Sequence, residues 1–367
     1  MSAPPLRVAT LAGDGIGPEV THAAVAVLQV VCERLAIPLQ LEALPYGATW
    51  YLATGTGLPA GEVQRLARSH DAILAGALGD PRVKDHAHVR LIRQALLTGL
   101  DLYANIRPAT LLSPTLSPLS HVQRGARVDL VVISENLEGF HADRDRRVRV
   151  TDDEDAYVTE EWHVPHLVAR LLRFTFEWAR QRGRRRVTLV DKTNLVPAHR
   201  LWRHAFQTVA IDYPELSHDV RLVDTLAHDL VRAPERLDVL VTTNLFGEIL
   251  SDLTAGLVGG MGIAASANLH PGRCSLFEPV HGSAPDLVGT GRANPLAAIR
   301  TAGLLLDTCG HREAAGMVHA AVLASLAAQV TTPDLGGRAT TEMVTDYVLR
   351  HLRLQPLPER PVHAGGR

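Results

Sequence analysis

The sequence predicts an α/β protein, and three observations support this fold class. Short apolar runs rich in β-branched residues alternate with longer segments of helical apolar spacing along the 367 residues. Several of the apolar runs end in polar side chains just before a helical segment, as strands do at the carboxyl edge of open α/β sheets. The 46% hydrophobic and 21% charged residues are typical of globular domains, and the length suffices for two of them.

The first element is a strand at residues 6–12, followed by a tight turn into a helix. The turn reads GDGIGPEV at residues 13–20 and places Pro18 near the first helical position. Its glycines do not have the Gly-x-Gly-x-x-Gly spacing of a Rossmann phosphate loop, so that fold is not supported. The helix continues through apolar residues at helical spacing: Val20, Ala23, Ala24, Val27, Leu28 and Val31.

The later elements continue the alternation. Strands are expected at residues 71–78, 102–106 and 128–134, and helices at residues 89–100, 165–182, 197–210 and 294–308. Residues 141–155 interrupt the pattern with many charges of both signs, which predicts a projecting arm or a mobile loop. The tail, residues 354–367, is rich in Pro and Gly and is expected to be frayed.

Lys192 is the most informative single residue. The chain has 37 Lys and Arg residues, of which only Lys84 and Lys192 are lysines. A guanidinium cannot give up a proton at any useful pH, whereas a partly buried ammonium can. Chance survival of a lysine is the alternative, and it suits Lys84. Lys192 instead follows an apolar strand at residues 187–190, in the motif DKTN, which favours a role in proton chemistry.

Three carboxylates predict a metal site near the same sheet edge. An apolar strand at residues 237–243 is followed by NLFGEILSD, and if that segment is helical, Glu248 and Asp252 share one face. Asp224 follows a third apolar run. Oxygen ligands of this kind suit Mg²⁺ or Mn²⁺. Each acid alone could simply cap a helix, but together with Lys192 they favour a metal site.

Composition excludes several functional classes. The formal net charge of −2 predicts no attraction to nucleic acid or to anionic membranes. No apolar run approaches the roughly 20 residues of a membrane helix, and Arg7 and Asp14 come too early for a signal peptide. The three distant cysteines, Cys32, Cys274 and Cys309, suggest free thiols in a reducing compartment. A cytoplasmic protein is expected.

The 18 histidines include two closely spaced groups. One is His86 with His88, and the other is His163 with His166. Neither group has cysteine or carboxylate companions at the spacing of a zinc site along the sequence. Both groups are therefore expected to be exposed, and neither is assigned a role.

The motifs together resemble one family. Over residues 6–352 the sequence resembles the β-decarboxylating dehydrogenases of isocitrate, isopropylmalate, homoisocitrate and tartrate. The segments that carry this resemblance, in the family order, are GDGIGPEV at residues 13–20, LYANIRP at 102–108, DKTN at 191–194, NLFGEILSD at 244–252, FEPVHGSAPD at 277–286 and PDLGG at 333–337.

The resemblance implies a two-domain α/β fold that differs from a Rossmann domain. Residues 1–102 and 259–367 would form a larger cofactor-binding domain. Residues 103–258 would form a smaller domain for dimerisation, metal binding and catalysis, with an arm at about 140–160 that pairs with the partner. In the implied homodimer each active site is shared, so Lys192 and Asp224 would serve the neighbouring subunit's Glu248 and Asp252, and a monomer would be inactive.

The resemblance also implies a nicotinamide cofactor. The family wraps the adenosine in the loop that here contains His281, Gly282, Ser283, Ala284 and Asp286, with Asn294 against the adenine and Glu278 at the start of the same motif. A carboxylate at Asp286 would bind the ribose hydroxyls and repel a 2′-phosphate, so NAD is preferred over NADP. The alternative for Asp286 is a helix-capping aspartate.

The implied reaction oxidises a 2-hydroxy acid by hydride transfer and then releases the 3-carboxylate as CO₂. Asp224, Glu248 and Asp252 would hold the metal. Lys192 would take the hydroxyl proton, directly or through Asp224. Family members protonate the enol carbon with a tyrosine, and His141 occupies that position here. With a reference pKa of about 6.5, a histidine is a competent acid near neutral pH.

Departures from the family concentrate where the substrate would bind. Of three arginines that grip malate-type substrates, Arg107 remains, while Leu97 and Ser134 stand at the other two positions. Glu248 also replaces an aspartate. In one interpretation the enzyme acts in a specialised pathway on an unusual substrate, whose second carboxylate is absent, masked or held by Arg93 or Arg90. In the others, the enzyme transfers hydride without decarboxylation, or the chain is a catalytically silent paralogue.

Overall fold

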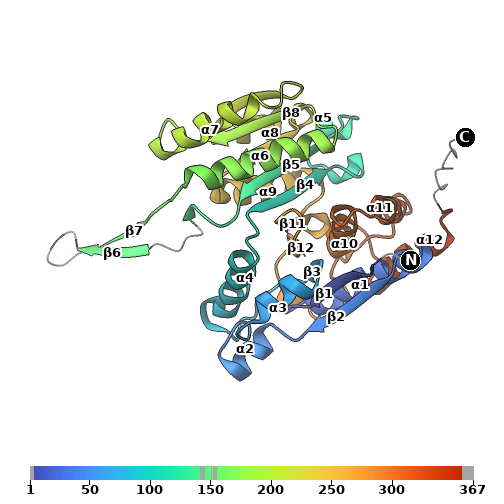
Figure 1. Ribbon diagram of the computed structural model, residues 1–367. Helices are drawn as coiled ribbons and strands as arrows, with labels where there is room; N and C mark the ends of the chain where they lie inside the picture. Colours follow the sequence, from blue (N-terminus) through green and yellow to red (C-terminus); the bar gives the residue numbers. More distant parts are fainter. Residues whose placement is uncertain (1–3, 141–144, 150, 152–154, 358–367) are drawn as a thin grey trace, which may run out of the picture.

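The main sheet of this computed structural model has ten strands in the order β2-β1-β3-β12-β11-β4-β5-β10-β8-β9. The structure describes residues 4–140, 145–149, 151 and 155–357. Helices α6, α7, α8 and α9 lie with β4, β5 and β8 in one part of Figure 1, while α1, α10, α11 and α12 lie with β1, β2 and β3 in the other. The predicted α/β fold class is therefore confirmed.

The strands are short and the helices vary from one turn to five. The strands are β1 Leu6–Leu11, β2 Leu39–Leu44, β3 Ala72–Ala75, β4 Ala104–Thr110, β5 Asp129–Glu135, β6 Asp145–Arg149, β7 Asp155–Thr159, β8 Arg186–Asp191, β9 Ser217–Leu222, β10 Val239–Thr242, β11 Ala265–Leu269 and β12 Ser275–Pro279. The α-helices are α1 Gly17–Arg34, α2 Ala48–Thr54, α3 Glu62–Ser69, α4 Ala87–Gly99, α5 Ser120–Gln123, α6 Pro165–Gln181, α7 Arg200–Ala210, α8 Val223–Arg232, α9 Asn244–Val258, α10 Leu296–Thr308, α11 Arg312–Ala327 and α12 Thr341–Leu354.

The sheet is parallel toward both ends and antiparallel in the middle. Strand β11 runs antiparallel to both of its neighbours, β12 and β4, and β4 runs antiparallel to β5. Strands β5, β10, β8 and β9 then form a parallel group. The main sheet thus runs through both predicted domains. Its strands β4, β5, β8, β9 and β10 come from residues 103–258, and its other strands come from the flanking segments. The domain boundaries themselves stay a prediction.

The predicted first helix forms as expected. Proline follows the first residue of α1, and the side chains at helical spacing, including Val20, Val27 and Val31, are fully buried. This buried stripe packs against α10 and α12. Apolar burial along one face, rather than helix propensity, supplies most of the stability of such a helix.

Strand β4 is longer than expected, because it continues through Pro108 to Thr110. A proline has no N–H to donate and is normally found at strand edges. On one side of β4, pairing with β11 covers only residues 104–106, so Pro108 lies beyond the end of that ladder. On the other side, β4 pairs with β5 over its whole length.

The charged segment after residue 140 contributes to a projecting arm, which was one of the two expectations for it. Strands β6 and β7 form a separate two-stranded antiparallel sheet that extends away from the main body (Figure 1). Arg149 and Asp155, whose side chains lie 2.7 Å apart, close one end of this ladder. His141 lies outside the described residues. Among the helices that the structure describes, none has the length and apolarity to cross a membrane.

Candidate active site

Lys192 lies in a turn that its neighbours hold rigidly. Strand β8 ends at Asp191, which is buried and accepts hydrogen bonds from Arg203 at 2.6 and 2.9 Å and from the N–H of Thr193 at 3.2 Å. Burial raises the pKa of Asp191, but these hydrogen bonds outweigh it and lower the pKa overall. The carbonyl of Lys192 accepts from the N–H groups of Leu195 and Val196 at 2.9 and 2.7 Å. These hydrogen bonds fix the backbone from which the Lys192 side chain extends.

The Lys192 ammonium contacts Asp224. Its Nζ donates to Asp224 Oδ2 at 2.7 Å, with 19% of the lysine side chain and 62% of the aspartate side chain exposed. The hydrogen bond from Lys192 lowers the pKa of Asp224, which lies in the first turn of α8. The structure therefore brings together two of the predicted catalytic residues, with Asp224 facing solvent on its other side.

Glu248 and Asp252 lie one turn apart on α9, and both are exposed. Arg107 faces them from β4, with its Nη1 3.4 Å from Asp252 Oδ1. Burial lowers the pKa of Arg107, while the charges of Glu248 and Glu278 oppose that effect. A largely buried guanidinium with only 15% of its side chain exposed thus points toward the face of α9 that carries the two acids.

A chain of amide side chains links Arg107 to Glu278. Arg107 Nε donates to Asn105 Oδ1 at 3.1 Å, and Asn105 donates in turn to Asn268 Oδ1 at 2.7 Å. Asn268 Nδ2 donates to Glu278 Oε1 at 3.1 Å, and Arg93 Nη2 lies 3.3 Å from the same oxygen. Sequence reasoning missed both asparagines. Asn105 stood within the quoted LYANIRP motif, whereas Asn268 had no sequence signal.

A small cleft of about 340 Å³ lies beside this network. Its lining includes Arg93, Leu97, Asn136, Phe140 and Glu248. A larger hollow of about 1580 Å³ lies elsewhere. It is bordered by α6 and the turn after β11, and none of the predicted site residues lines it.

The two positions that lack the family arginines are both enclosed. Leu97 has 7% of its surface exposed and packs in an apolar cluster with residues of β1, β3 and α4. Ser134, 4% exposed, lies under Gly247 of α9. Neither side chain can make an ion pair with a carboxylate. Within the cleft, the positive charges come from Arg90 and Arg93.

The three predicted metal ligands are not gathered in a single chain. Among the described residues, the one group of three metal-ligating side chains with ligand atoms within 4.8 Å of one another is Glu161, His163 and His199. Asp224 instead pairs with Lys192, while Glu248 and Asp252 stand beside Arg107. The exposed carboxylate pair on α9 offers oxygen atoms of the kind that a hard cation prefers as ligands.

The predicted cofactor loop packs against the turn that follows β1. Ile16 donates its N–H to the carbonyl of Ser283 at 2.8 Å. A Cβ on Gly15 would lie 2.1 Å from that carbonyl oxygen, so only glycine permits the approach. Ala284 has a left-handed backbone with φ of 38°. The two loops therefore form one unit.

The side chains of this loop fit an adenine nucleotide. Burial lowers the pKa of His281, whose Nδ1 contacts the carbonyl of Gly282 at 3.0 Å and so leaves its buried Nε2 as an acceptor with no described partner. Asn294 is held by Asp334 at 2.8 Å, and its Oδ1 accepts from Leu296 N at 3.0 Å. Asp286 is exposed and makes no ion pair with the described residues. It is therefore open to a ligand hydroxyl.

Asp14 organises the same region, and sequence reasoning gave it no role. Its Oδ1 accepts from Ala48 N at 2.7 Å, and its Oδ2 accepts from Gly79 N and lies near His88 Nε2, both at 2.9 Å. His88 is fully buried, so the expectation that it is exposed was wrong. The GDG sequence was the available signal, because a short acid between two glycines often serves the backbone of a turn.

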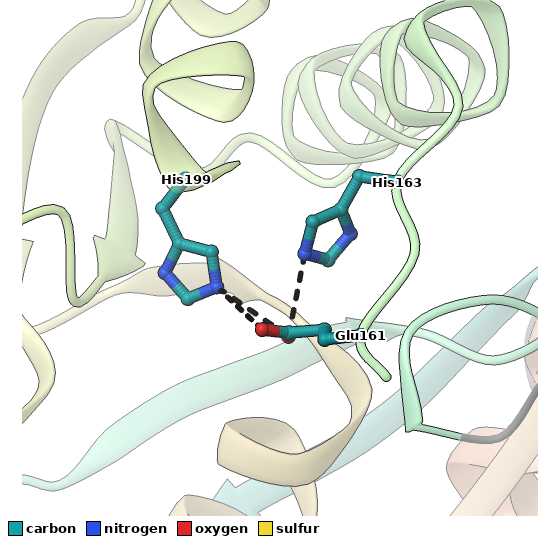
Figure 2. Close-up of side chains that lie close together, drawn as sticks. All are labelled: Glu161, His163 and His199. Atoms are coloured by element: carbon teal, nitrogen blue, oxygen red, sulfur yellow. Dashed lines mark hydrogen bonds and ion pairs between the residues drawn. The ribbon is translucent and has the colours of Figure 1, made fainter. Parts of the chain in front are cut away.

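The side chain of His163 is only 3% exposed, contrary to expectation, and it does have a carboxylate companion. Figure 2 shows Glu161 between His163 and His199, with nitrogen-to-oxygen distances of 3.3 Å to each ring. His199 comes from the short helix η4 Pro197–His199, 38 residues beyond Glu161 in the chain. The sequence spacing rule failed because folding supplied the second histidine from a distant element.

Replacing Gly247 with alanine is expected to destabilise the protein by about 1 to 3 kcal/mol and to displace α9. An added Cβ would lie 2.2 Å from Ser134 Cβ, and that atom cannot move independently of strand β5. Chemical unfolding with a linear extrapolation would measure the loss. Because α9 carries Glu248 and Asp252, cation binding should weaken as well.

Gly256 provides the matched control in the same helix. A Cβ there meets no atom within 4 Å, so Gly256→Ala should be neutral or stabilise by about 0.5 to 1 kcal/mol. Equal stability of the two variants would show that α9 does not rely on the close contact with Ser134.

Comparisons with known proteins agree with this geometry. The profile of a family described as "Isocitrate/isopropylmalate dehydrogenase" matches residues 7–348. A 3-isopropylmalate dehydrogenase of Clavibacter sepedonicus is 42% identical over 95% of this chain and 98% of its own length. An Agrobacterium vitis protein named "Probable tartrate dehydrogenase/decarboxylase" is 36% identical over 93% and 96%.

Solved structures show the same likeness. The isocitrate dehydrogenase of Methylococcus capsulatus superposes with a TM-score of 0.84 and 34% identity, covering 95% of this chain and 99% of its own. The apo form of a β-decarboxylating dehydrogenase of Thermococcus kodakarensis superposes with a TM-score of 0.77 and 32% identity, covering 94% and 96%. The predicted resemblance in fold is confirmed over nearly the whole length.

Proposed function

Because the chain belongs to the isocitrate/isopropylmalate dehydrogenase family and is thus a dehydrogenase acting on a CH–OH group, we propose that it oxidises a 2-hydroxy acid with NAD and Mg²⁺ or Mn²⁺. The observation that carries the proposal is the contact of Lys192 Nζ with Asp224 at 2.7 Å at the carboxyl edge of β8 and β9. Open α/β sheets bind their ligands at this edge, which supports a role for Lys192 as the proton acceptor.

Each residue of the site has a distinct task. Lys192, in its neutral form, takes the proton of the substrate hydroxyl, and Asp224 holds its ammonium afterwards. Arg107 binds a substrate carboxylate, since its planar guanidinium suits two parallel hydrogen bonds. When bound, NAD would supply a hydride acceptor and the cation would supply positive charge beside the oxygen on the carbon that is oxidised. Asp224, Glu248 and Asp252 would hold the cation.

The preference for NAD over NADP is supported by Asp286. Its carboxylate is exposed on the short helix η7 Pro285–Leu287, next to the adenosine loop. A carboxylate there can accept hydrogen bonds from both ribose hydroxyls and would repel a 2′-phosphate. His281, Ser283 and Asn294 would contact the rest of the nucleotide.

A homodimer with shared sites is supported by the separation of the metal ligands within one chain and by the projecting arm (Figure 1). A dimer would place Lys192 and Asp224 beside the partner subunit's Glu248 and Asp252. The three cysteines, Cys32, Cys274 and Cys309, are free thiols, which is consistent with the reducing interior of a cell and so with a cytoplasmic enzyme.

We infer that the substrate differs from a simple malate. Leu97 and Ser134 carry no positive charge to pair with a carboxylate, so a second carboxylate is absent, masked or held by Arg90 or Arg93, which both line the cleft. A 3-substituted malate-like acid, or a variant lacking one carboxylate, fits this set. For a 3-substituted malate-like diacid, the proposal includes loss of the 3-carboxylate as CO₂, with His141 as the acid. For a substrate that lacks one carboxylate, it includes hydride transfer alone.

The test is NADH formation by the purified protein with Mn²⁺ across paired substrates. Each 3-substituted malate is compared with matching 2-hydroxy and 3-hydroxy acids that lack one carboxylate, and CO₂ is measured in parallel. Turnover of monoacids alone would make this a plain dehydrogenase. Turnover of a malate, with a KM that rises in Arg93→Lys, would assign the second carboxylate to Arg93. Absence of turnover with NAD still bound would contradict the catalytic proposal and favour a silent paralogue.

Arg107→Lys is expected to raise KM for the best substrate roughly 10- to 100-fold. A charge-assisted hydrogen bond contributes about 1.5 to 3 kcal/mol, and a lysine cannot form the paired contact. Steady-state kinetics would measure the change. Arg292→Lys, on the exposed surface near Thr290, serves as the control. An unchanged KM in Arg107→Lys would exclude Arg107 as the carboxylate ligand.

A further inference from the structure

His199 connects the backbone of Lys192 to Glu161. Its Nδ1 lies 3.0 Å from the backbone nitrogen of Lys192 and accepts that N–H. Its Nε2 lies 3.3 Å from Glu161 Oε2. The side chain of His199 is fully buried. Its ring lies at 87° to that of Phe246 and at 62° to that of His163, with centroid distances of 5.7 and 5.4 Å. Both ring nitrogens are thus committed within the protein.

The hydrogen-bond partners assign the protons on this ring. An imidazole nitrogen that accepts an N–H carries no proton, so the proton of His199 lies on Nε2 and points toward Glu161. Burial raises the pKa of Glu161, but hydrogen bonds from His163 and His199 outweigh it and lower the pKa to about 2. Glu161 is therefore a carboxylate at neutral pH and accepts the proton of Nε2. Turning the ring over would place a carbon against the Lys192 N–H.

From this arrangement we propose that His199, oriented by Glu161, is a positioning residue that holds the backbone of Lys192 in its reactive place. The proposal rests on the proposed catalytic role of Lys192. The carbonyl of Lys192 is fixed by Leu195 and Val196, so His199 supplies the remaining backbone contact. With both backbone groups bound, the long side chain starts from a defined point, which catalytic geometry requires.

The same three side chains could instead bind a transition metal, and the hydrogen bonds argue against it. To ligate a metal, Nε2 of His199 must give up its proton, and the neutral ring would then carry it on Nδ1. That proton would face the N–H of Lys192, so two donors would meet and the backbone bond would break. A ring that serves Lys192 is therefore unavailable to a metal.

Glu161 also connects Lys192 to the base of the arm. It lies two residues beyond the end of β7, and the next residue, Trp162, pairs with Gly139 on the other side of the arm. A path of contacts thus runs from the arm through Glu161 and His199 to Lys192. The positioning residues therefore lie next to the point where the arm leaves the main body.

The test uses the two lysines of the chain. In full-length protein labelled with ¹⁵N-lysine, only Lys84 and Lys192 have labelled backbone amides, and Lys84 is exposed. We expect the Lys192 amide to exchange slowly with solvent in the unaltered protein. In His199→Gln it should exchange about tenfold faster or more, because the longer amide places its polar group near Nε2 instead of Nδ1. The Lys84 signal is the internal control.

His199→Asn is the conservative variant. Its amide oxygen can occupy the place of Nδ1 and accept the Lys192 N–H, so slow exchange should return. If the chain turns over substrate as proposed, His199→Gln should lower kcat at least tenfold with little change in KM, and His199→Asn should recover most of it. The amide exchange decides the inference even if no substrate is found.

His163→Ala distinguishes positioning of Lys192 from metal binding by Glu161, His163 and His199. His163 contacts Glu161 but not Lys192, so this variant should keep the slow amide exchange. Two results would overturn the proposal. One is an unchanged Lys192 amide in His199→Gln. The other is one equivalent of Zn²⁺ in the purified protein, measured by elemental analysis, that disappears in His163→Ala.

Discussion

Replacing Lys192 with methionine is expected to lower kcat by about 10²- to 10⁴-fold, which is the usual contribution of a positioned acid or base. Methionine fills similar space but cannot accept the hydroxyl proton or pair with Asp224. Lys192→Arg should be almost as inactive, because a guanidinium keeps its proton even though it preserves the charge beside Asp224. Single-turnover measurement of NADH formation would report hydride transfer directly.

Lys84→Met is the matched control, since Lys84 is the only other lysine and is exposed. It should turn over at the rate of the unaltered protein. A Lys192→Arg variant that retains normal turnover would show that Lys192 acts as a fixed charge and that another group takes the proton.

The shared site can be tested with the same variant. Lys192→Met and Asp252→Asn should each be inactive alone, but subunit exchange between them should restore about one quarter of full activity. Half of the dimers are then mixed, and each mixed dimer has one site with both residues intact. If all catalytic groups of a site came from one chain, mixing would restore nothing.

Asp14→Ala is expected to cost about 3 kcal/mol or more of unfolding free energy, because each buried donor that loses its acceptor costs about 1 to 3 kcal/mol. Only 7% of Asp14 is exposed, and its removal leaves His88 and two backbone N–H groups unsatisfied inside the protein. Urea unfolding would measure the loss. Because the turn with Asp14 packs on Ser283, NAD affinity should fall in the same variant.

Glu177→Ala provides the comparison, since Glu177 pairs with Arg180 on the surface of α6. Exposed pairs contribute about 0 to 1 kcal/mol, so this variant should stay close to the unaltered protein. A similarly small loss in Asp14→Ala would mean that backbone hydrogen bonds alone hold the turn.

The elements with strong local signals were predicted well. Helix α6 begins at Pro165, as expected, and ends one residue before the expected end. Helix α9 follows β10 and places Glu248 and Asp252 one turn apart. In contrast, β11 was not predicted. Its sequence, ASANL, lacks the β-branched and aromatic residues of a typical strand, and pairing with β12 and β4 on both sides makes it one.

The residues of the candidate site also divide into those that a local sequence signal identifies and those that it does not. Lys192, Asp224 and the cofactor loop could be proposed because each lies in a short motif or directly after an apolar strand. Asn268, Glu161 and His199 could not, since their importance comes from partners in distant elements. The histidines were judged by spacing along the chain, and that measure fails when the carboxylate or second ring arrives from another element.

The sequence by itself determined the fold class, the family and the identity of the proton-transfer candidate, because contiguous motifs and periodic apolar residues encode local structure. Only the tertiary structure decided which groups face one another. Arg107 meets Asp252 across 145 residues, and Lys192 receives its backbone partner from η4. The order of strands in the sheet brings such residues together, and that order depends on the packing of the whole chain, which no local pattern records.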